Sequence, residues 1–251
     1  MTSAEQEDPS PLAILDDYDF ALPESSIAQA PTAERDSARL LVLDGETGKI
    51  LESGPDHRVR DLTRWLRRGD LLVMNSTRVR SARLVGRKVS GGAAEALLLG
   101  PDVASQSSHR ALIQCTGRIR DGLAFHFGPN SELDATITAI HDRGEVTLRF
   151  ASEVDPYAHG QPPLPPYIRR PSAQSAEDLE RYQTIYAKEP GAIAAPTAGL
   201  HFTGDLLAII RDTGTTITEL TLHVVLATCA PVSCDRLDDH PMHAESGVVG
   251  S

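Results

Sequence analysis

Short apolar runs separated by turn signals dominate the middle of the chain. The runs lie at residues 71–74, 95–99, 110–115, 134–140 and 145–150. Turn-forming sequences separate them, namely Gly91-Gly92, Asp121-Gly122, Gly128-Pro129-Asn130 and Asp142-Arg143-Gly144. Short strands at this spacing, with no helical pattern between them, are typical of a small barrel or sandwich. We therefore predict a β-barrel-like domain over residues 70–156.

The flanking segments carry both helical and strand patterns. Helices are predicted at 61–69, 177–187 and 204–212, the last capped by Thr203, and strands at 39–44 and 220–226. Because strand and helix patterns resume after the barrel-like segment, residues 17–69 and 157–251 are predicted to form one α/β domain. The fold class is therefore an α/β domain interrupted by an inserted small β-barrel-like domain.

Two further segments have unusual composition. Residues 1–16 are predicted to form a disordered acidic lead-in, because they contain several acids, prolines and no basic residue. Residues 161–170 contain four prolines. This density excludes a helix or a central strand, so an ordered extended arm or a linker is expected there.

Charge is distributed very unevenly along the chain. The formal net charge is −11, and aromatic residues make up 4% of the sequence, which together disfavour a general nucleic-acid binder. However, residues 58–88 contain ten Lys or Arg and two acids, a net +8, which leaves −19 for the remainder. Such a basic block can direct a polyanion to one face, although a solvated basic face paired with acids remains the alternative.

Composition also bears on compartment and metals. No apolar stretch approaches the roughly 20 residues of a membrane helix, and three cysteines suit a reduced cytoplasmic interior. His240 and His243 lie three residues apart, near Cys234 and Asp238, but this spacing fits no standard zinc site. We therefore expect no metal and no membrane association, and the sequence gives no signal for an oligomeric state.

Two histidines lie in settings that allow proton transfer. The segment 196–203 leads into the N-terminus of a predicted helix, where free N–H groups favour an anion, and it contains His201. His223 lies within a predicted strand. A packed structural histidine is the alternative in both places. The sequence contains no Gly-rich phosphate loop, no G-x-S-x-G motif and no dinucleotide fingerprint.

Several longer motifs together resemble one known family. They are DYDFALP (17–23), RRGDLLVMNSTRVRSARL (67–84), PLPPYIRR (163–170), RYQTIYAKEPGAIAAPTAGLHFT (181–203), LTLHVVLATCAPV (220–232) and HPMHAE (240–245). On these motifs the chain resembles the S-adenosylmethionine:tRNA ribosyltransferase-isomerases of queuosine biosynthesis (QueA). The resemblance runs from about Asp17 to the end of the chain.

The resemblance implies a transferase reaction. Such enzymes transfer and isomerise the ribosyl moiety of S-adenosylmethionine onto 7-aminomethyl-7-deazaguanine in tRNA. The product is epoxyqueuosine-tRNA, and adenine and methionine are released. The partners are therefore S-adenosylmethionine, consumed as a substrate rather than held as a cofactor, and tRNA carrying the deazaguanine precursor. The family fold, an α/β domain carrying a β-barrel domain, agrees with the organisation predicted above.

The resemblance also implies roles for individual residues. His201 and His223 are the candidates for proton transfer. Contacts to tRNA phosphates are expected from Arg78, Arg80 and Arg83, which would position tRNA without specifying its sequence. The residues expected to bind substrate are Tyr167, Arg169, Tyr182, Gln183, Thr184, Pro196, Thr197, Ala198, Gly199, Phe202, His240, His243 and Glu245.

The chain departs from the family pattern at three places. The usual Gly-x-Gly-Thr-Phe-Arg-Pro is here Val225–Pro231, Asn-Asp-Thr-Arg is here Asn75–Arg78, and the chain stops at Ser251 before further family motifs. The sequence therefore predicts a C-terminally truncated member. Two alternatives to an active ribosyltransferase-isomerase are a silent paralogue that binds a nucleoside or RNA, and a related S-adenosylmethionine-using enzyme with a small-molecule acceptor.

Overall fold

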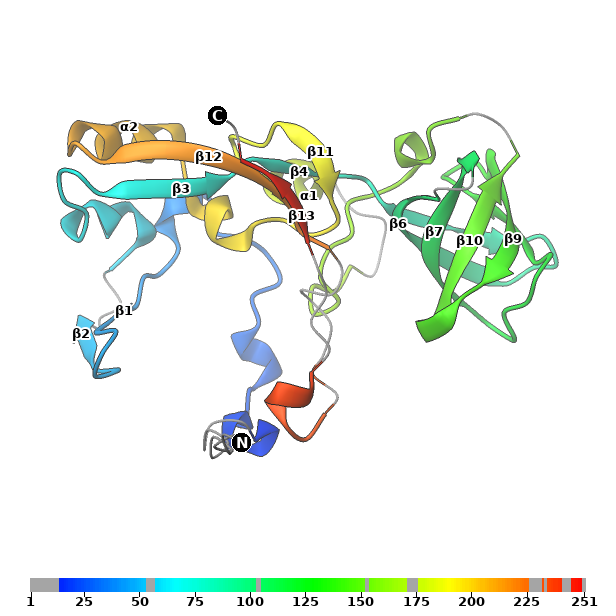
Figure 1. Ribbon diagram of the computed structural model, residues 1–251, viewed down its shortest axis with the longest axis horizontal. Coiled ribbons are helices and arrows are strands. Elements are labelled where there is room, and N and C mark those ends of the chain that lie inside the picture. Colours follow the sequence, from blue (N-terminus) through cyan, green and yellow to red (C-terminus); the bar gives the residue numbers. More distant parts are fainter. Residues whose placement is uncertain are drawn as a thin grey trace, which may run out of the picture.

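A closed β-barrel lies at one end of the long axis of the molecule, and small mixed sheets with a helix lie at the other (Figure 1). The computed structural model describes residues 14–52, 57–102, 105–151, 154–170, 176–225, 232, 234–240 and 245–249. No helix in this described part is long and apolar enough to cross a membrane.

Six antiparallel strands form the barrel. They are β5 (Arg83–Lys88), β6 (Ala93–Asp102), β7 (Ser105–Cys115), β8 (Ala124–Phe127), β9 (Leu133–Ile140) and β10 (Glu145–Phe150). Their order is β10-β7-β6-β5-β8-β9, and pairing of β9 with β10 closes the ring. The predicted barrel is confirmed. Its β5 and β8 were absent from the predicted strands, because each is short and interrupted by glycine or polar residues.

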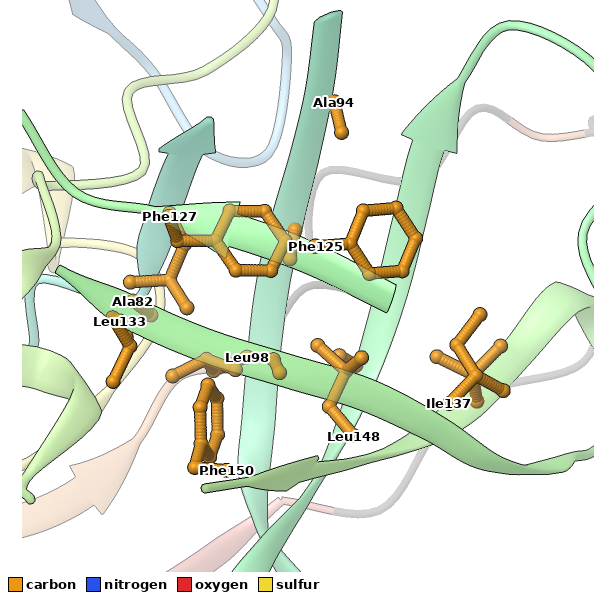
Figure 2. Close-up of a cluster of buried hydrophobic side chains, with 14 residues drawn as sticks. Ala82, Ala94, Leu98, Phe125, Phe127, Leu133, Ile137, Leu148 and Phe150 are labelled. Carbon is orange, nitrogen blue, oxygen red and sulfur yellow. The ribbon is translucent and has the colours of Figure 1, made fainter. Parts of the chain in front are cut away.

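The barrel interior is filled by alternate residues of every strand (Figure 2). Phe125 and Phe127 are almost fully buried and stack with ring centroids 5.4 Å apart. Alanines at buried positions of neighbouring strands, including Ala94, Ala96 and Ala135, leave room for these rings. The interior is therefore a packed core.

His109 on β7 lies in an apolar environment near this core. Its ring makes edge contacts with Phe150 and Tyr157, and its Nδ1 atom is buried without a hydrogen-bond partner among the described residues. Burial lowers the pKa of His109; the nearby Asp155 carboxylate opposes this change and Arg80 reinforces it. The folded protein therefore favours the neutral imidazole.

A pH-dependent stability follows from this buried imidazole. The unfolded chain takes up the proton near the ordinary histidine pKa of about 6.5, whereas the folded chain resists protonation. Stability from neutral His109 is therefore present above that pH and is lost as the pH falls below it. In urea titrations from about pH 7.5 to about pH 5, wild type should lose more stability than His109→Phe. Parallel curves would contradict this expectation.

The mixed sheets combine segments that are far apart in sequence. β3 (Leu71–Asn75) pairs in parallel with β12 (Thr216–His223), which also pairs with β13 (Ser246–Val248). β4 (Thr77–Val79) pairs in parallel with β11 (Glu189–Ala192), and β1 (Val42–Leu43) pairs with β2 (Ile50–Glu52). Residues 71–74, expected within the barrel-like segment, therefore belong to a different sheet. A local pattern cannot reveal this, because the partner strand follows much later in the chain.

The described residues form two α-helices, α1 (Ala176–Arg181) and α2 (Gly204–Asp212). Thr203 caps α2 as predicted, because its Oγ1 accepts a hydrogen bond from the Leu206 N–H at 3.1 Å. The predicted helix at 177–187 ends at Arg181. Short 3-10 turns are η2 (Leu15–Tyr18), η3 (Glu24–Ser26), η4 (Arg35–Ser37), η5 (Val59–Arg64), η6 (Asp142–Gly144), η7 (Pro156–His159), η8 (Thr197–His201) and η10 (Leu237–Asp239).

Other segment predictions have mixed outcomes. The proline-rich arm 161–170 contains no helix, and among the described residues its strand-type pairing is limited to a bridge from Gln161 to Arg83. The predicted helix at 61–69 is the shorter turn η5. Residues 1–13 of the predicted lead-in lie outside the described residues, while Leu15 donates its N–H to the Asp235 carbonyl at 2.9 Å.

Candidate active site

Three adjoining hollows extend from the junction of the barrel and the sheets, along the proline-rich arm, to α1 and turn η8. Hollow A, about 400 Å³, lies between the barrel and the arm. Hollow B, about 240 Å³, contains His223, and hollow C, also about 240 Å³, contains Tyr167 and Thr197. Ile193 lines both A and B. Four arm residues line both A and C, namely Leu164, Pro165, Ile168 and Arg170. These shared walls make the hollows neighbours in one region.

His223 is held at the end of β12 in hollow B. Its Nδ1 atom lies 2.7 Å from Oγ1 of Thr77, which is fully buried. The imidazole packs on Gly191, where any Cβ atom would overlap with the ring. Arg80 lines the same hollow, and its guanidinium lies 4.9 Å from the centroid of the Tyr157 ring. The hydrogen bond to Thr77 and the packing on Gly191 therefore set the orientation of the His223 ring.

Hydrogen bonds of the polar segment 75–77 hold Thr77 and the end of β12 in place beside His223. The Asn75 amide donates to the Leu222 carbonyl at 2.8 Å and accepts from the Leu222 N–H at 3.0 Å, which binds it to the end of β12. Its oxygen also accepts from the Thr77 N–H at 3.1 Å. Ser76 is buried and donates to the Leu220 carbonyl at 3.1 Å. The buried Ser76 hydroxyl therefore has a hydrogen-bond partner, the Leu220 carbonyl.

Hollow C brings together three predicted substrate-binding residues, Tyr167, Tyr182 and Thr197. Its wall includes an ion pair between Arg170 and Asp178 at 2.7 Å, and hydrogen bonding to this carboxylate raises the pKa of Arg170. The predicted residue Arg169 instead pairs with Glu24 at 2.8 Å on the surface, where both side chains are largely exposed.

Three other predicted residues support the walls of this region. The Gln183 amide accepts from the Val79 N–H at 3.0 Å and donates to the Val79 carbonyl at 2.8 Å. Gly199 is buried, and a Cβ atom there would overlap with the Tyr186 hydroxyl. Thr184 is buried beside Gly199. Gln183, Thr184 and Gly199 line none of the three hollows described above.

The two candidate histidines do not meet in one hollow. His201 ends turn η8, is half-buried and lines none of hollows A, B and C, whereas His223 lines hollow B. Pro196 and Phe202 are half-buried at the two ends of the same turn, and Ala198 is exposed.

The C-terminal motif is described only in part. His240 is half-buried, and its Nδ1 atom has no hydrogen-bond partner among the described residues. Glu245 accepts a hydrogen bond from the Val225 N–H at 3.3 Å, and the next residue, Ser246, lines hollow B. His243 and residues 226–231 of the altered loop lie outside the described residues.

The three predicted phosphate-binding arginines differ in their environments. Arg78 is exposed and donates to the Ala187 carbonyl at 2.7 Å, and Arg80 donates to the Pro190 carbonyl at 3.2 Å. Arg83, by contrast, binds both carboxylate oxygens of Glu95 at 2.6 Å, and this bonding raises the pKa of the guanidinium. Its charge is therefore already compensated within the protein.

Comparison with known proteins decides the family. The family model described as "Queuosine biosynthesis protein" matches residues 15–251. The chain belongs to this queuosine biosynthesis family. A curated relative from Caulobacter sp. (strain K31), named S-adenosylmethionine:tRNA ribosyltransferase-isomerase, is 42% identical over 94% of this chain and 67% of its own length.

A solved structure is also similar to the chain. The crystal structure of S-adenosylmethionine tRNA ribosyltransferase from Thermotoga maritima is 26% identical, with a TM-score of 0.32. The match covers 82% of this chain and 58% of the Thermotoga chain. The chain thus spans about two thirds of the Caulobacter protein and less than two thirds of the Thermotoga protein.

Several residues that shape the site in this family member were not singled out from the sequence. Thr77 and Gly191 fix the His223 ring, and Arg35 contacts the segments 180–183 and 197–201. Thr77 and Gly191 lie within motifs that carry the resemblance, so the motifs were a usable signal for them. No group of three or more His, Cys, Asp or Glu side chains among the described residues is arranged to hold a metal ion.

Proposed function

We propose that this chain acts as an S-adenosylmethionine:tRNA ribosyltransferase-isomerase. The observation that carries this proposal is the 42% identity to the Caulobacter enzyme across 94% of the chain. The reaction transfers and isomerises the ribosyl moiety of S-adenosylmethionine onto 7-aminomethyl-7-deazaguanine in tRNA. The products are epoxyqueuosine-tRNA, adenine and methionine. S-adenosylmethionine is consumed as a substrate, so the proposal requires no resident cofactor.

His223 is the proposed base. The sulfonium of S-adenosylmethionine acidifies the C5′ protons, and removal of one of them gives an ylide that expels adenine. The substrate amine then forms a bond to the sugar fragment, and closure of the epoxide breaks the bond from the sugar carbon to sulfur and releases methionine. Thr77 Oγ1 also lies 3.5 Å from the Glu189 carbonyl. When the Thr77 hydroxyl donates to that carbonyl, the Nδ1–H of His223 donates to Thr77 Oγ1. Nε2 then carries the free lone pair that a general base needs.

The substrates are proposed to occupy hollows A, B and C. Tyr167, Tyr182 and Thr197 line hollow C and are proposed to contact the substrate there. His201 remains a second candidate for proton transfer, from the turn that contains Thr197. Further predicted binding residues are retained in this proposal, either as contacts or as supports of the walls: Arg169, Gln183, Thr184, Pro196, Ala198, Gly199, Phe202, His240, His243 and Glu245.

The fold assignment is completed by proposals about domains and location. Residues 17–69 and 157–251 are proposed to form one α/β domain around an inserted barrel domain. The barrel strands span Arg83–Phe150, within the predicted 70–156. A cytoplasmic location, where tRNA is modified, is part of the same proposal.

Release of adenine tests the proposed function. Purified protein is incubated with S-adenosylmethionine and tRNA bearing 7-aminomethyl-7-deazaguanine, with the Caulobacter enzyme as a positive control. Adenine that depends on both substrates supports the proposal. No adenine above background, while the control is active, contradicts it. Binding of the same tRNA without turnover would favour the silent paralogue, and adenine release with the free deazaguanine base would favour the small-molecule acceptor.

Arginine substitutions test the proposed tRNA surface. Arg78→Ala and Arg80→Ala should each weaken tRNA binding and reduce the slope of log affinity against log salt by about one, because each would lose one phosphate contact. Arg83→Ala should leave the slope unchanged, because Glu95 already neutralises its guanidinium. Affinities measured across a salt series check both statements. A reduced slope only in Arg83→Ala would reverse the assignment.

A further inference from the structure

Arg35, in turn η4, joins two segments that come from different parts of the chain. Its Nη1 atom donates to the Gln183 carbonyl at 2.9 Å and to the Leu200 carbonyl at 3.1 Å. Its Nη2 atom donates to the Glu180 carbonyl at 3.0 Å. One guanidinium therefore binds the main chain at the end of α1 and the main chain of turn η8.

Both joined segments are connected to the candidate active site. Gln183 is bound through its side chain to Val79 of β4, so the carbonyl that Arg35 holds belongs to a segment fixed on the sheet. Leu200 lines hollow C and immediately precedes His201. Arg35 thus connects a fixed part of the sheet with the turn that contains Thr197 and His201.

A second arginine, Arg181, connects the same two parts of the chain in the opposite direction, from α1 to the segment before Arg35. Arg181 at the end of α1 donates to the Ala33 carbonyl at 2.8 Å and to the Thr32 carbonyl at 2.6 Å. The segment before Arg35 is therefore bound by α1 while Arg35 binds the segment after α1. Burial lowers the pKa of Arg35, as does the nearby Arg181, with Glu180 opposing them. The Arg35 side chain is thus partly removed from water, and its hydrogen bonds are stronger in the protein interior than they would be in water.

We propose that Arg35 is a positioning residue that holds turn η8 in a fixed position relative to the Arg181–Thr184 segment for the reaction. This inference rests on the proposed function. The planar guanidinium presents several donors in a fixed geometry, whereas an ammonium group is a single point of charge on a flexible stem. Lysine therefore cannot reproduce the connection between Gln183 and Leu200. The Arg35 side chain itself lines none of hollows A, B and C.

Activity measurements on Arg35→Gln and Arg35→Lys test the proposal. We expect kcat for adenine release to fall by about tenfold to a hundredfold, because small displacements of reacting groups carry costs of this order. KM for S-adenosylmethionine should change less than kcat, since Arg35 does not line the hollows. Millimolar guanidinium should restore part of kcat to Arg35→Ala. The control is Arg236→Ala, whose side chain pairs with Asp238 at the surface and should show neither effect.

Hydrogen exchange supplies a readout that does not depend on activity. In Arg35→Gln, peptides that cover residues 197–202 should exchange faster than in wild type, while the barrel peptides stay unchanged. Unchanged exchange in 197–202 would overturn the inference. Normal kcat per folded molecule would also overturn it, even with faster exchange. If wild type itself releases no adenine, the proposed function fails, and the exchange data alone decide whether Arg35 holds the turn.

Discussion

Replacing His223 with glutamine should lower kcat for adenine release by about 10²–10⁴-fold, the usual contribution of a positioned general base. Glutamine approximates the size of the imidazole and can still hydrogen-bond to Thr77, so the end of β12 should remain in place. Its amide cannot accept the proton at catalytic pH. Steady-state kinetics with saturating S-adenosylmethionine and tRNA measure the loss.

Two further variants make this result specific. His126→Gln removes a partly exposed barrel histidine that pairs with Asp134, and its kcat should equal that of wild type. Thr77→Val removes the hydroxyl that orients His223 and should lower kcat less than His223→Gln does, because the imidazole remains. Wild-type kcat in His223→Gln would show that the base lies elsewhere, and His201→Gln would then be measured next.

Replacing Phe127 with alanine should destabilise the protein by about 3–5 kcal/mol, because it leaves a cavity in a closed core. Phe127 is fully buried and stacks on Phe125, and the barrel strands around it are fixed by pairing on both sides. The core therefore has little freedom to collapse into the vacated space. Urea unfolding followed by circular dichroism measures the loss.

Phe20→Ala is the matched control for this prediction. Phe20 is 70% exposed, so its removal should change the free energy of unfolding by less than about 0.5 kcal/mol. Equal effects of the two substitutions would mean that the barrel interior is not the stabilising core. A small effect of Phe127→Ala alone would lead to the same conclusion.

The barrel could be predicted from sequence because its signal is local. Short runs and glycine turns follow one another between residues 83 and 150, and most barrel strands pair with a neighbour in the chain. β3 could not be assigned correctly, because its partner β12 begins at Thr216. Nothing within residues 71–75 distinguishes a parallel strand with a distant partner from a barrel strand.

The candidate site was predicted less completely than the fold. Tyr167, Tyr182 and Thr197 were identified and lie together in hollow C. Gln183 and Gly199, also expected at the substrate, line none of the three hollows; Gln183 is hydrogen-bonded to Val79, and Gly199 packs against Tyr186. The positions of Arg35 and Thr77 depend on tertiary contacts between segments more than one hundred residues apart in sequence. Residue type alone therefore could not indicate their roles.

The closed barrel has a consequence for the order of folding. All six of its strands lie in one continuous stretch that ends at Phe150, so the strand pairs that close it need no later part of the chain. The sheet that contains His223 cannot form until β12 has been synthesised, because β3 pairs with β12 and the whole barrel lies between these two strands in the sequence. Because domains form as units during synthesis and distant parallel pairing is slow, the barrel can close on the ribosome before the sheet that contains His223 forms. The barrel is then already folded when β11 and β12 are synthesised and pair with β4 and β3.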